Sequence, residues 1–117
     1  MTTDLRDTPT SYALLLYEPQ DFNTPEVKID EYVQWFQEYH QKGLVHSGEE
    51  LASAGWVIQQ EAGRPILFDK GIVSGEHGPL SGFFLITAEN DKQALDIAST
   101  CPHLKYHGVL ELRTITH

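Results

Sequence analysis

The most regular pattern in the chain is a helical one in its first third. Apolar and ring-bearing residues recur there at steps of three and four, as they do along one face of an amphipathic helix. They are Ile29, Tyr32, Val33, Phe36, Tyr39 and His40. Thr24, Pro25 and Glu26 supply a hydroxyl N-cap, a proline at the first helical position and an acid in the first turn. Gly43, preceded by Lys42 at the negative helix end, predicts where this helix stops.

A second, shorter helix is predicted near residue 90. Asn90 and Gln93 have the spacing of a capping box, in which the first caps the helix and the second reaches back to its start. An apolar stripe follows, made of Ala94, Leu95, Ile97 and Ala98. Because a residue before proline disfavours helical backbone, this helix should stop before Pro102.

Short apolar runs predict strands around these helices. They cover residues 11–18, 82–87 and 109–115 and, less regularly, 50–60 and 66–68, with a turn at 61–65 between the last two. Residues 69–82 carry four glycines and a proline, so we predict an exposed loop there.

This order of strands and helices predicts an α+β fold. Two amphipathic helices among at least four strands favour a two-layer sandwich, with one antiparallel sheet and both helices on one of its faces. We expect a flexible tail over residues 1–9 and a single domain over residues 10–117. The other sheet face would be apolar and uncovered, which favours a homodimer.

Charge and composition narrow the functional classes. The 117 residues include 8 Lys and Arg against 17 Asp and Glu, a net charge of −9, and the cations are scattered singly. This charge distribution disfavours nucleic acid and anionic membranes as partners. No apolar run reaches the roughly 20 residues of a membrane-spanning helix, and no secretory signal is visible, so we expect a soluble cytoplasmic protein. The single cysteine, Cys101, excludes an internal disulfide and a multi-cysteine zinc site.

Several strings, in their order and spacing, resemble the YCII-related family, and most closely its DGPF-domain branch. They are Tyr12-Ala-Leu-Leu-Leu-Tyr17, Gly43-Leu-Val-His-Ser-Gly-Glu-Glu-Leu51, Leu80-Ser-Gly-Phe-Phe-Leu-Ile86, Asn90-Asp-Lys-Gln-Ala-Leu95, Cys101-Pro-His103 and Gly108-Val-Leu-Glu-Leu-Arg113. The resemblance spans about residues 11–115. It implies a ferredoxin-like fold of the dimeric α+β barrel type, with a pocket near the dimer interface.

The chain also departs from the family pattern. The resemblance places the acid–base His of the family near Tyr32 and its Asp near Ala52, so that pair is absent here. Neither side chain can relay a proton near neutral pH as a His–Asp pair does. Of the DGPF string, Asp69 and Gly71 correspond.

Histidines and carboxylates in predicted loops and element ends are the candidate functional residues. They are His46, Glu49, Asp69, His77 and His103. Imidazole with carboxylate suits an acid–base pair or an oxygen–nitrogen metal site, but the spacing matches no metal signature. We therefore expect no metal and no cofactor. Ordinary surface and capping histidines are the competing interpretation, and Cys101, at a helix end that raises a thiol pKa, is expected to have a packing role.

Three functional hypotheses follow. The first is a small homodimeric protein that binds a small molecule in a pocket near the dimer interface. The second is a lyase or hydrolase of the YCII-related kind that uses His and carboxylate acid–base chemistry. The third is a purely structural dimer with a vestigial pocket. Convergence of His46, Glu49 and His77 on one apolar cavity would favour the enzyme.

Overall fold

The computed structural model describes residues 9–19, 26–72 and 74–116, and the side chains of residues 68–72 and 74 lie outside this description. The elements are β1 (Thr10–Tyr17), α1 (Ile29–Gln41), β2 (Val45–Glu50), β3 (Ala54–Glu61), β4 (Arg64–Ile72), β5 (Ser74–Gly75), β6 (Gly78–Ala88), α2 (Asp91–Ser99), the 3₁₀ helix η2 (Pro102–Tyr106) and β7 (Val109–Thr114). Apart from Pro9, the predicted tail lies outside the described residues. No described helix is long and apolar enough to cross a membrane.

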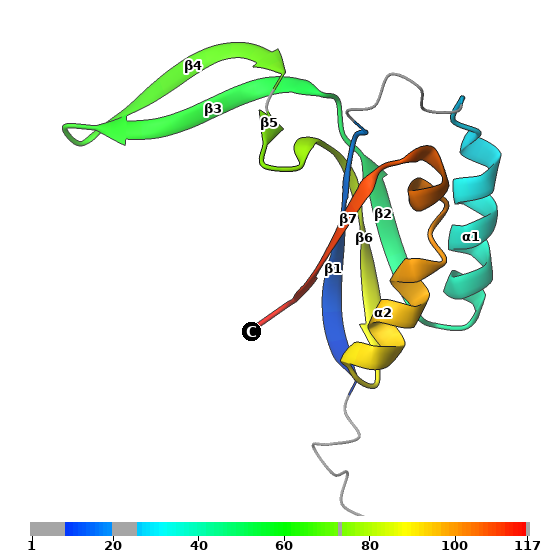
Figure 1. Cartoon of the computed structure of the whole chain (residues 1–117). Coiled ribbons are helices and arrows are strands. Elements are labelled where there is room, and N and C mark those ends of the chain that lie inside the picture. The colour runs from blue at the N-terminus through cyan, green and yellow to red at the C-terminus, as the bar shows by residue number, and fades with distance from the viewer. Residues whose placement is uncertain (1–8, 20–25, 73, 117) are drawn as a thin grey trace, which may run out of the picture.

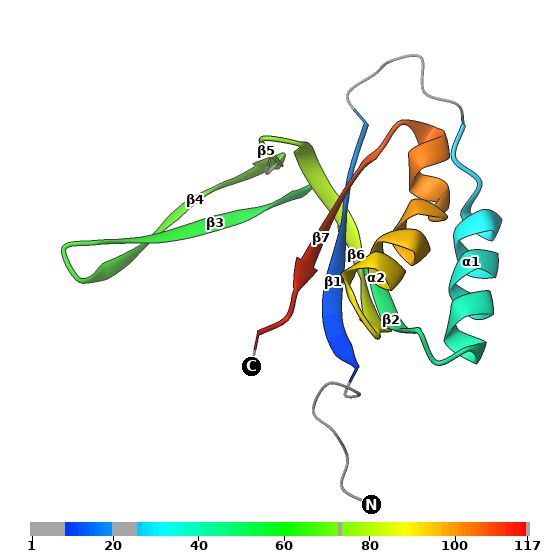
Figure 2. The same ribbon diagram turned by 60° about the horizontal axis from the view of Figure 1, so that its bottom comes forward.

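The main sheet has the strand order β2-β6-β1-β7, and β5 pairs with the start of β6. Every neighbouring pair in it is antiparallel. Helices α1 and α2 cover the same face of this sheet, and no helix of the described residues lies on the opposite face (Figures 1 and 2). The prediction of an α+β sandwich with two helices and an antiparallel sheet is confirmed.

The core lies between the sheet and the helices. In β1, alternate residues Tyr12, Leu14 and Leu16 are buried, and Leu14 is 0% exposed. Leu14 is the Cα partner of Phe84 in β6, which packs against this core, and Trp35 of α1 is buried in it. The alternation in β1 therefore sets which face meets the helices. The intervening side chains of the strands form the open face of the sheet.

A long hairpin, formed by β3 and β4, projects from the body on the side away from the helices (Figures 1 and 2). Glu61 and Arg64 are Cα partners at its tip, so Ala62 and Gly63 form a two-residue turn. Both have positive φ angles, 51° and 80°, as a type I′ turn requires. The predicted turn at residues 61–65 is confirmed.

The predicted loop at residues 69–82 is wrong. β4 continues to Ile72, opposite Ala54, and β6 begins at Gly78. Glycine and proline weaken a strand by themselves, but cross-strand partners satisfy the backbone here. The strand β2, Val45–Glu50, lies mostly before the predicted strand at residues 50–60.

The first helix begins later than predicted. Residues 26–28 are not helical, α1 begins at Ile29, and Lys28 occupies the N-cap position without a side-chain hydrogen bond. The proposed start at Thr24 and Pro25 lies outside the described residues. In α2 the cap is confirmed, because the Asn90 side chain accepts the Gln93 N–H at 2.8 Å. The Gln93 side chain reaches back one residue further, to the N–H of Glu89, at 2.7 Å.

Candidate functional site

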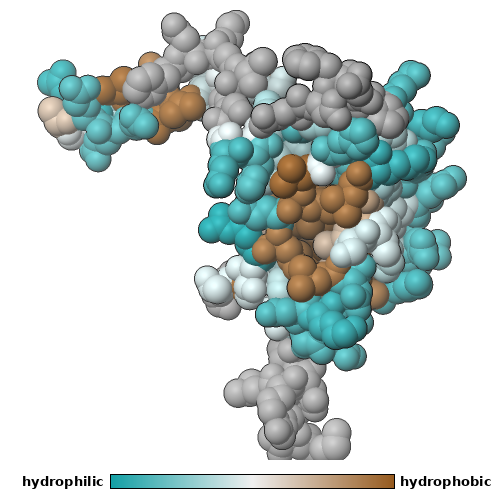
Figure 3. All heavy atoms as spheres, in the orientation of Figure 1, coloured by the Kyte–Doolittle hydropathy of each residue, from teal (hydrophilic) through white to brown (hydrophobic). Residues whose placement is uncertain are grey.

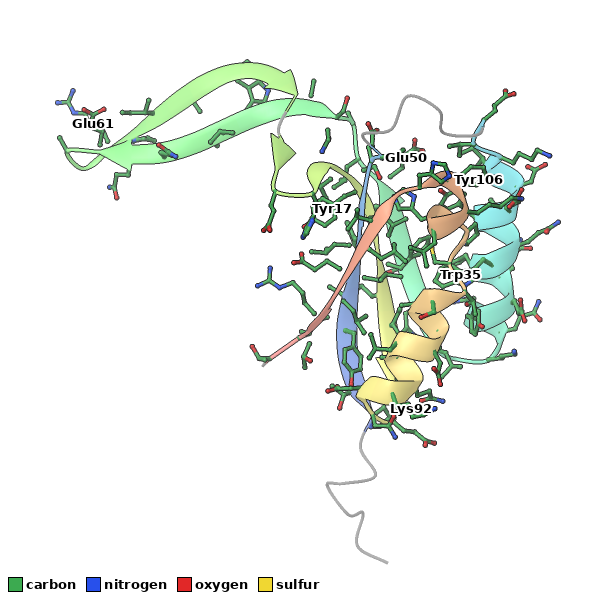
Figure 4. All side chains as sticks on the ribbon, viewed as in Figure 1. Tyr17, Trp35, Glu50, Glu61, Lys92 and Tyr106 are labelled. Carbon is green, nitrogen blue, oxygen red and sulfur yellow. The ribbon has the colours of Figure 1, made fainter. Side chains whose placement is uncertain are left out.

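A cavity of about 730 Å³ lies between α1 and the end of the sheet where β2 finishes and β6 begins. Glu50, at the end of β2, marks this end of the domain, opposite Lys92 (Figure 4). Apolar side chains form most of the wall. The main ones are Leu16, Ile29, Val33, Phe36 and Phe84. A concave, mainly apolar site of this size is typical of small-molecule binding.

Two glycines make room for the cavity wall. A Cβ atom on Gly48 would lie 2.3 Å from the Phe84 ring, and one on Gly82 would lie 2.7 Å from the backbone oxygen of Glu49. The Phe84 ring therefore extends over the backbone of β2. It also meets Trp35 edge-on, with ring centroids 5.0 Å apart, and this contact fixes its position from the helix side.

The polar part of the wall is acidic. Three carboxylate residues line the cavity, namely Glu18, Glu49 and Glu50, and no Lys or Arg is among its lining residues in the described part of the chain. Glu49 and Glu50 are exposed, so water reaches these carboxylates. The remaining polar groups include Tyr32, Ser81 and His103. The cavity thus combines aromatic rings with negative charge, which suits cations.

His103 is held at the cavity wall by both ring nitrogens. Its side chain is buried, and residue exposure is 6%. Nε2 lies 2.7 Å from the carbonyl oxygen of Tyr17, which can only accept, so Nε2 carries the proton. Nδ1 is then the acceptor for the Tyr32 hydroxyl at 2.9 Å. Burial lowers the pKa of His103 below its ordinary value, against the opposing effects of the Tyr17 carbonyl and the Glu18 charge.

Tyr32 stays a neutral hydrogen-bond donor. Burial raises the pKa of its hydroxyl well above the ordinary value, and the neighbouring Cys101 and Tyr106 add to the shift. Its ring stacks on Tyr106, with centroids 6.1 Å apart. Tyr32 and His103 are therefore a neutral, mutually satisfied pair, and neither is poised to exchange a proton with a ligand.

Gly108 allows His103 to reach this position. A Cβ atom on Gly108 would lie 2.2 Å from Nε2 of His103. The close approach brings the turn after η2 against the imidazole ring. Of the sequence-predicted residues, His103 is the one most tightly fixed by its surroundings.

The structure brings Glu49 and His103 to the cavity and places the other candidates elsewhere. His46 is exposed on β2 and its Nε2 pairs with the hydroxyl of Thr87. His77 lies in the turn between β5 and β6 and packs edge-on against Tyr17, with ring centroids 5.3 Å apart. Neither His46 nor His77 lines the cavity.

The remaining candidates have no place in this site. Asp69 lies in β4, and its side chain is outside the description. Cys101 is buried, and burial raises the pKa of its thiol to about 11, which suits the packing role expected for it. Among the described residues, no three His, Cys, Asp or Glu side chains gather closely enough to hold a metal ion.

Sequence reasoning missed the aromatic and glycine part of the wall. The histidines and carboxylates are selected for their chemistry, whereas Phe36 appears only as part of a helical face and Phe84 only as part of a predicted strand. One signal was present, since an isolated glycine in a strand such as Gly48 often marks a close approach by another group. The sequence did not predict β2, so Gly48 could not be recognised as a glycine within a strand.

The sequence matches no known protein-family model, and no curated protein is significantly similar to it.

Proposed function

We propose that this protein binds a small apolar molecule in the cavity between α1 and the sheet, and that it does so as a homodimer. The observation that carries the proposal is the cavity itself, about 730 Å³ in volume, with Phe36 and Phe84 in its wall. Burial of apolar ligand surface against such a wall supplies the affinity, and a few polar groups orient the ligand.

The wall favours a ligand with a positive charge. The carboxylates of Glu18 and Glu50 attract a cation, and the cavity offers no described Lys or Arg to neutralise an anion. Phenyl rings add a cation–π attraction to an ammonium group. A primary or quaternary amine with an apolar body therefore fits the site better than a carboxylic acid of the same shape.

Binding is favoured over acid–base catalysis. Both nitrogens of His103 are occupied by Tyr17 and Tyr32, and His46 and His77 lie away from the cavity. A lyase or hydrolase using these histidines would need one of them to reach a reacting atom. The enzyme hypothesis keeps one supporting observation, because Glu49 and His103 line the same cavity.

We further propose that the domain is a ferredoxin-like member of the YCII-related family. The strand order β2-β6-β1-β7, with the helices in β1-α1-β2 and β6-α2-β7 connections, supports the fold. The open sheet face supports a dimer of the α+β barrel type, because half-buried Leu15, Phe83 and Leu85 have no helix over them. The free, buried Cys101 is compatible with a reducing cytoplasm.

Calorimetric titration with octylamine, octanol and octanoate tests the site and its charge preference. We expect octylamine to bind at least about tenfold more tightly than octanoate, a difference of about 1.4 kcal/mol, with octanol between them. Equal or tighter binding of octanoate contradicts the charge preference. Failure of all three to bind contradicts the binding function, and chemical conversion of a bound amine would favour the enzyme.

A matched pair of variants locates the binding in the cavity. Val33 is an exposed residue of α1 whose side chain lines the cavity, so Val33→Trp should fill it without disturbing the core. Leu95→Trp places the same bulk on an exposed position of α2 that does not line the cavity. Octylamine binding should be lost in the first variant and kept in the second. The combined Glu49→Gln and Glu50→Gln changes should remove the preference for octylamine over octanol.

A further inference from the structure

The β3–β4 hairpin exposes apolar side chains that nothing in the described chain covers. Trp56, Ile58 and Leu67 are 61%, 65% and 64% exposed. Ile58 and Leu67 are Cα partners, so their side chains lie on the same face of the ribbon. Figure 3 shows apolar side chains gathered on the projecting hairpin, apart from the apolar patch on the body.

Such a hairpin needs something to pack against. β3 and β4 pair only with each other among the described strands. A two-stranded ribbon without a packed face is marginally stable in water, and its outer edges have unpaired backbone groups. Because the strands have eight and nine residues, the ribbon extends far from the body, by about 30 Å at 3.3 Å per residue.

The open sheet face is also smaller than the area that a stable interface buries on each partner. Four strands of six to eleven residues, about 4.8 Å apart, span roughly 19 × 26 Å, which is about 500 Å². A stable interface buries about 800 Å² on each partner. One face of the hairpin, roughly 30 Å long and 10 Å wide, adds about 300 Å². The open face and the hairpin together approach the required area, whereas neither does alone.

The charges on the two surfaces are complementary under a two-fold axis. The hairpin tip carries Glu61 opposite Arg64. The open face carries Glu111 and Arg113 on β7, as the Cα partners of Leu15 and Ala13 show. The hairpin tip and β7 therefore each carry one acid and one base, which a second copy can pair despite the net charge of −9.

We propose that the hairpin is an arm that grips a second copy of this chain seated on the open sheet face. The hairpin projects on the side of the open sheet face, so the hairpin and that face are adjacent surfaces (Figures 1 and 2). In a two-fold dimer each arm holds the other protomer, and apolar residues such as Trp56 become buried. The inference rests on the homodimer of the proposed function and assigns a role to the hairpin within it.

Light scattering across a dilution series tests the arm. In the combined variant Ile58→Thr and Leu67→Thr, the β-branched threonines keep the strand propensity but remove the apolar surface. The dimer dissociation constant should rise by at least about 100-fold, equal to about 2.7 kcal/mol. The control variant, Leu95→Gln with Leu104→Gln, removes two exposed leucines from the helical side and should leave the constant unchanged.

The outcomes separate the arm from the dimer itself. A wild-type chain that is monomeric at every concentration overturns both proposals. A threonine variant that dimerises as tightly as the wild type overturns the arm and leaves the dimer standing.

Fluorescence of the unmodified chain gives a second test that does not depend on a variant's folding. Trp56 is exposed and Trp35 is buried in the core, so dissociation should shift the emission to longer wavelength. The shift should vanish in Trp56→Phe. Dissociation without any shift in the wild type also overturns the arm.

Discussion

The strands β1 and β4 each contain a run of apolar residues, but their surroundings are very different. In the body, Leu14 of β1 is 0% exposed because β6, β7 and the helices surround it. In the hairpin, Leu67 of β4 is 64% exposed, because β4 pairs with no described strand other than β3. Apolar residues in a strand therefore indicate a surface that requires cover, and do not say whether the same chain provides it.

The largest expected effect is the difference between two leucine truncations. Leu14→Ala should lower the free energy of unfolding by about 3 kcal/mol, because it leaves a cavity in the core. Leu67→Ala should change it by less than about 0.5 kcal/mol in the monomer, because the side chain is already in water. Urea unfolding of both variants at concentrations too low for dimerisation measures the difference. Equal losses would mean that the hairpin is packed within one chain.

The second effect concerns close packing around His103. Gly108→Ala should lower the free energy of unfolding by about 2 kcal/mol, because the new Cβ would collide with the buried imidazole. Gly75→Ala is the matched change near the base of the hairpin, where a Cβ meets nothing within 4 Å, and should cost less than about 0.5 kcal/mol. Thermal unfolding compares the two. Equal tolerance would show that the body is as adaptable as the hairpin region.

The third effect is smaller and comes from one hydroxyl group. Tyr32→Phe leaves Nδ1 of His103 without its donor, so the free energy of unfolding should fall by about 1–2 kcal/mol. Tyr39→Phe removes a hydroxyl that accepts an exposed hydrogen bond from Thr100 and should cost less. If Tyr32→Phe lowers the free energy of unfolding no more than Tyr39→Phe does, water replaces the lost donor. The Tyr32–His103 pair is then accessible to solvent.

The same histidine predicts a pH dependence. Because the pKa of His103 is lower in the folded state, the unfolded chain takes up a proton first as the pH falls. Its contribution to stability is therefore complete above about pH 6.5 and is lost progressively below that value. Melting temperatures between pH 7.5 and 5.5 should fall in the wild type and fall less in His103→Gln.

The smallest effect involves a surface ion pair. Hydrogen bonds from Lys105 and Tyr106 lower the pKa of Glu31 in the folded state. The carboxylate therefore stabilises the fold above its unfolded pKa of about 4.5. This contribution is lost as the pH falls through the lower pKa of the folded state. Glu31→Gln should lower the melting temperature slightly at pH 7, with the difference vanishing in acid. An equal effect at both pH values would assign the loss to packing.

Local patterns predicted the helices and three of the strands because their signals are local. The apolar alternation and the capping box around Asn90 depend on residues that are near one another in sequence. Strand pairing depends on residues that are far apart in sequence. It explains both errors in the middle of the chain, namely the predicted loop at residues 69–82 and the bounds of the predicted strand at residues 50–60. Within the predicted loop, residues 69–72, 74–75 and 78–82 are in strands through partners such as Ala54, and β2 forms against β6 with few apolar residues of its own.

The sequence predicts the residue types of the candidate site but not how these residues are arranged in space. His103 and Glu49 were selected as residue types, but the hydrogen bond from His103 to Tyr17 joins positions 86 residues apart. His46 was a candidate on the same grounds, but ordinary alternation puts it on the face opposite the buried Val45, and the irregular register between Val45 and Ser47 brings Glu49 opposite Phe83. A bulge of this kind changes which face a side chain takes.

The ring of Phe84 over Gly48 has a consequence for how this chain can vary. The two positions share one volume, so an added side chain at position 48 is sterically allowed only when position 84 becomes smaller. Substitutions at these positions should therefore be coupled, with the double change tolerated where the first alone is not. Because both residues line the cavity, such an exchange would reshape the space available to a ligand while leaving the rest of the fold in place.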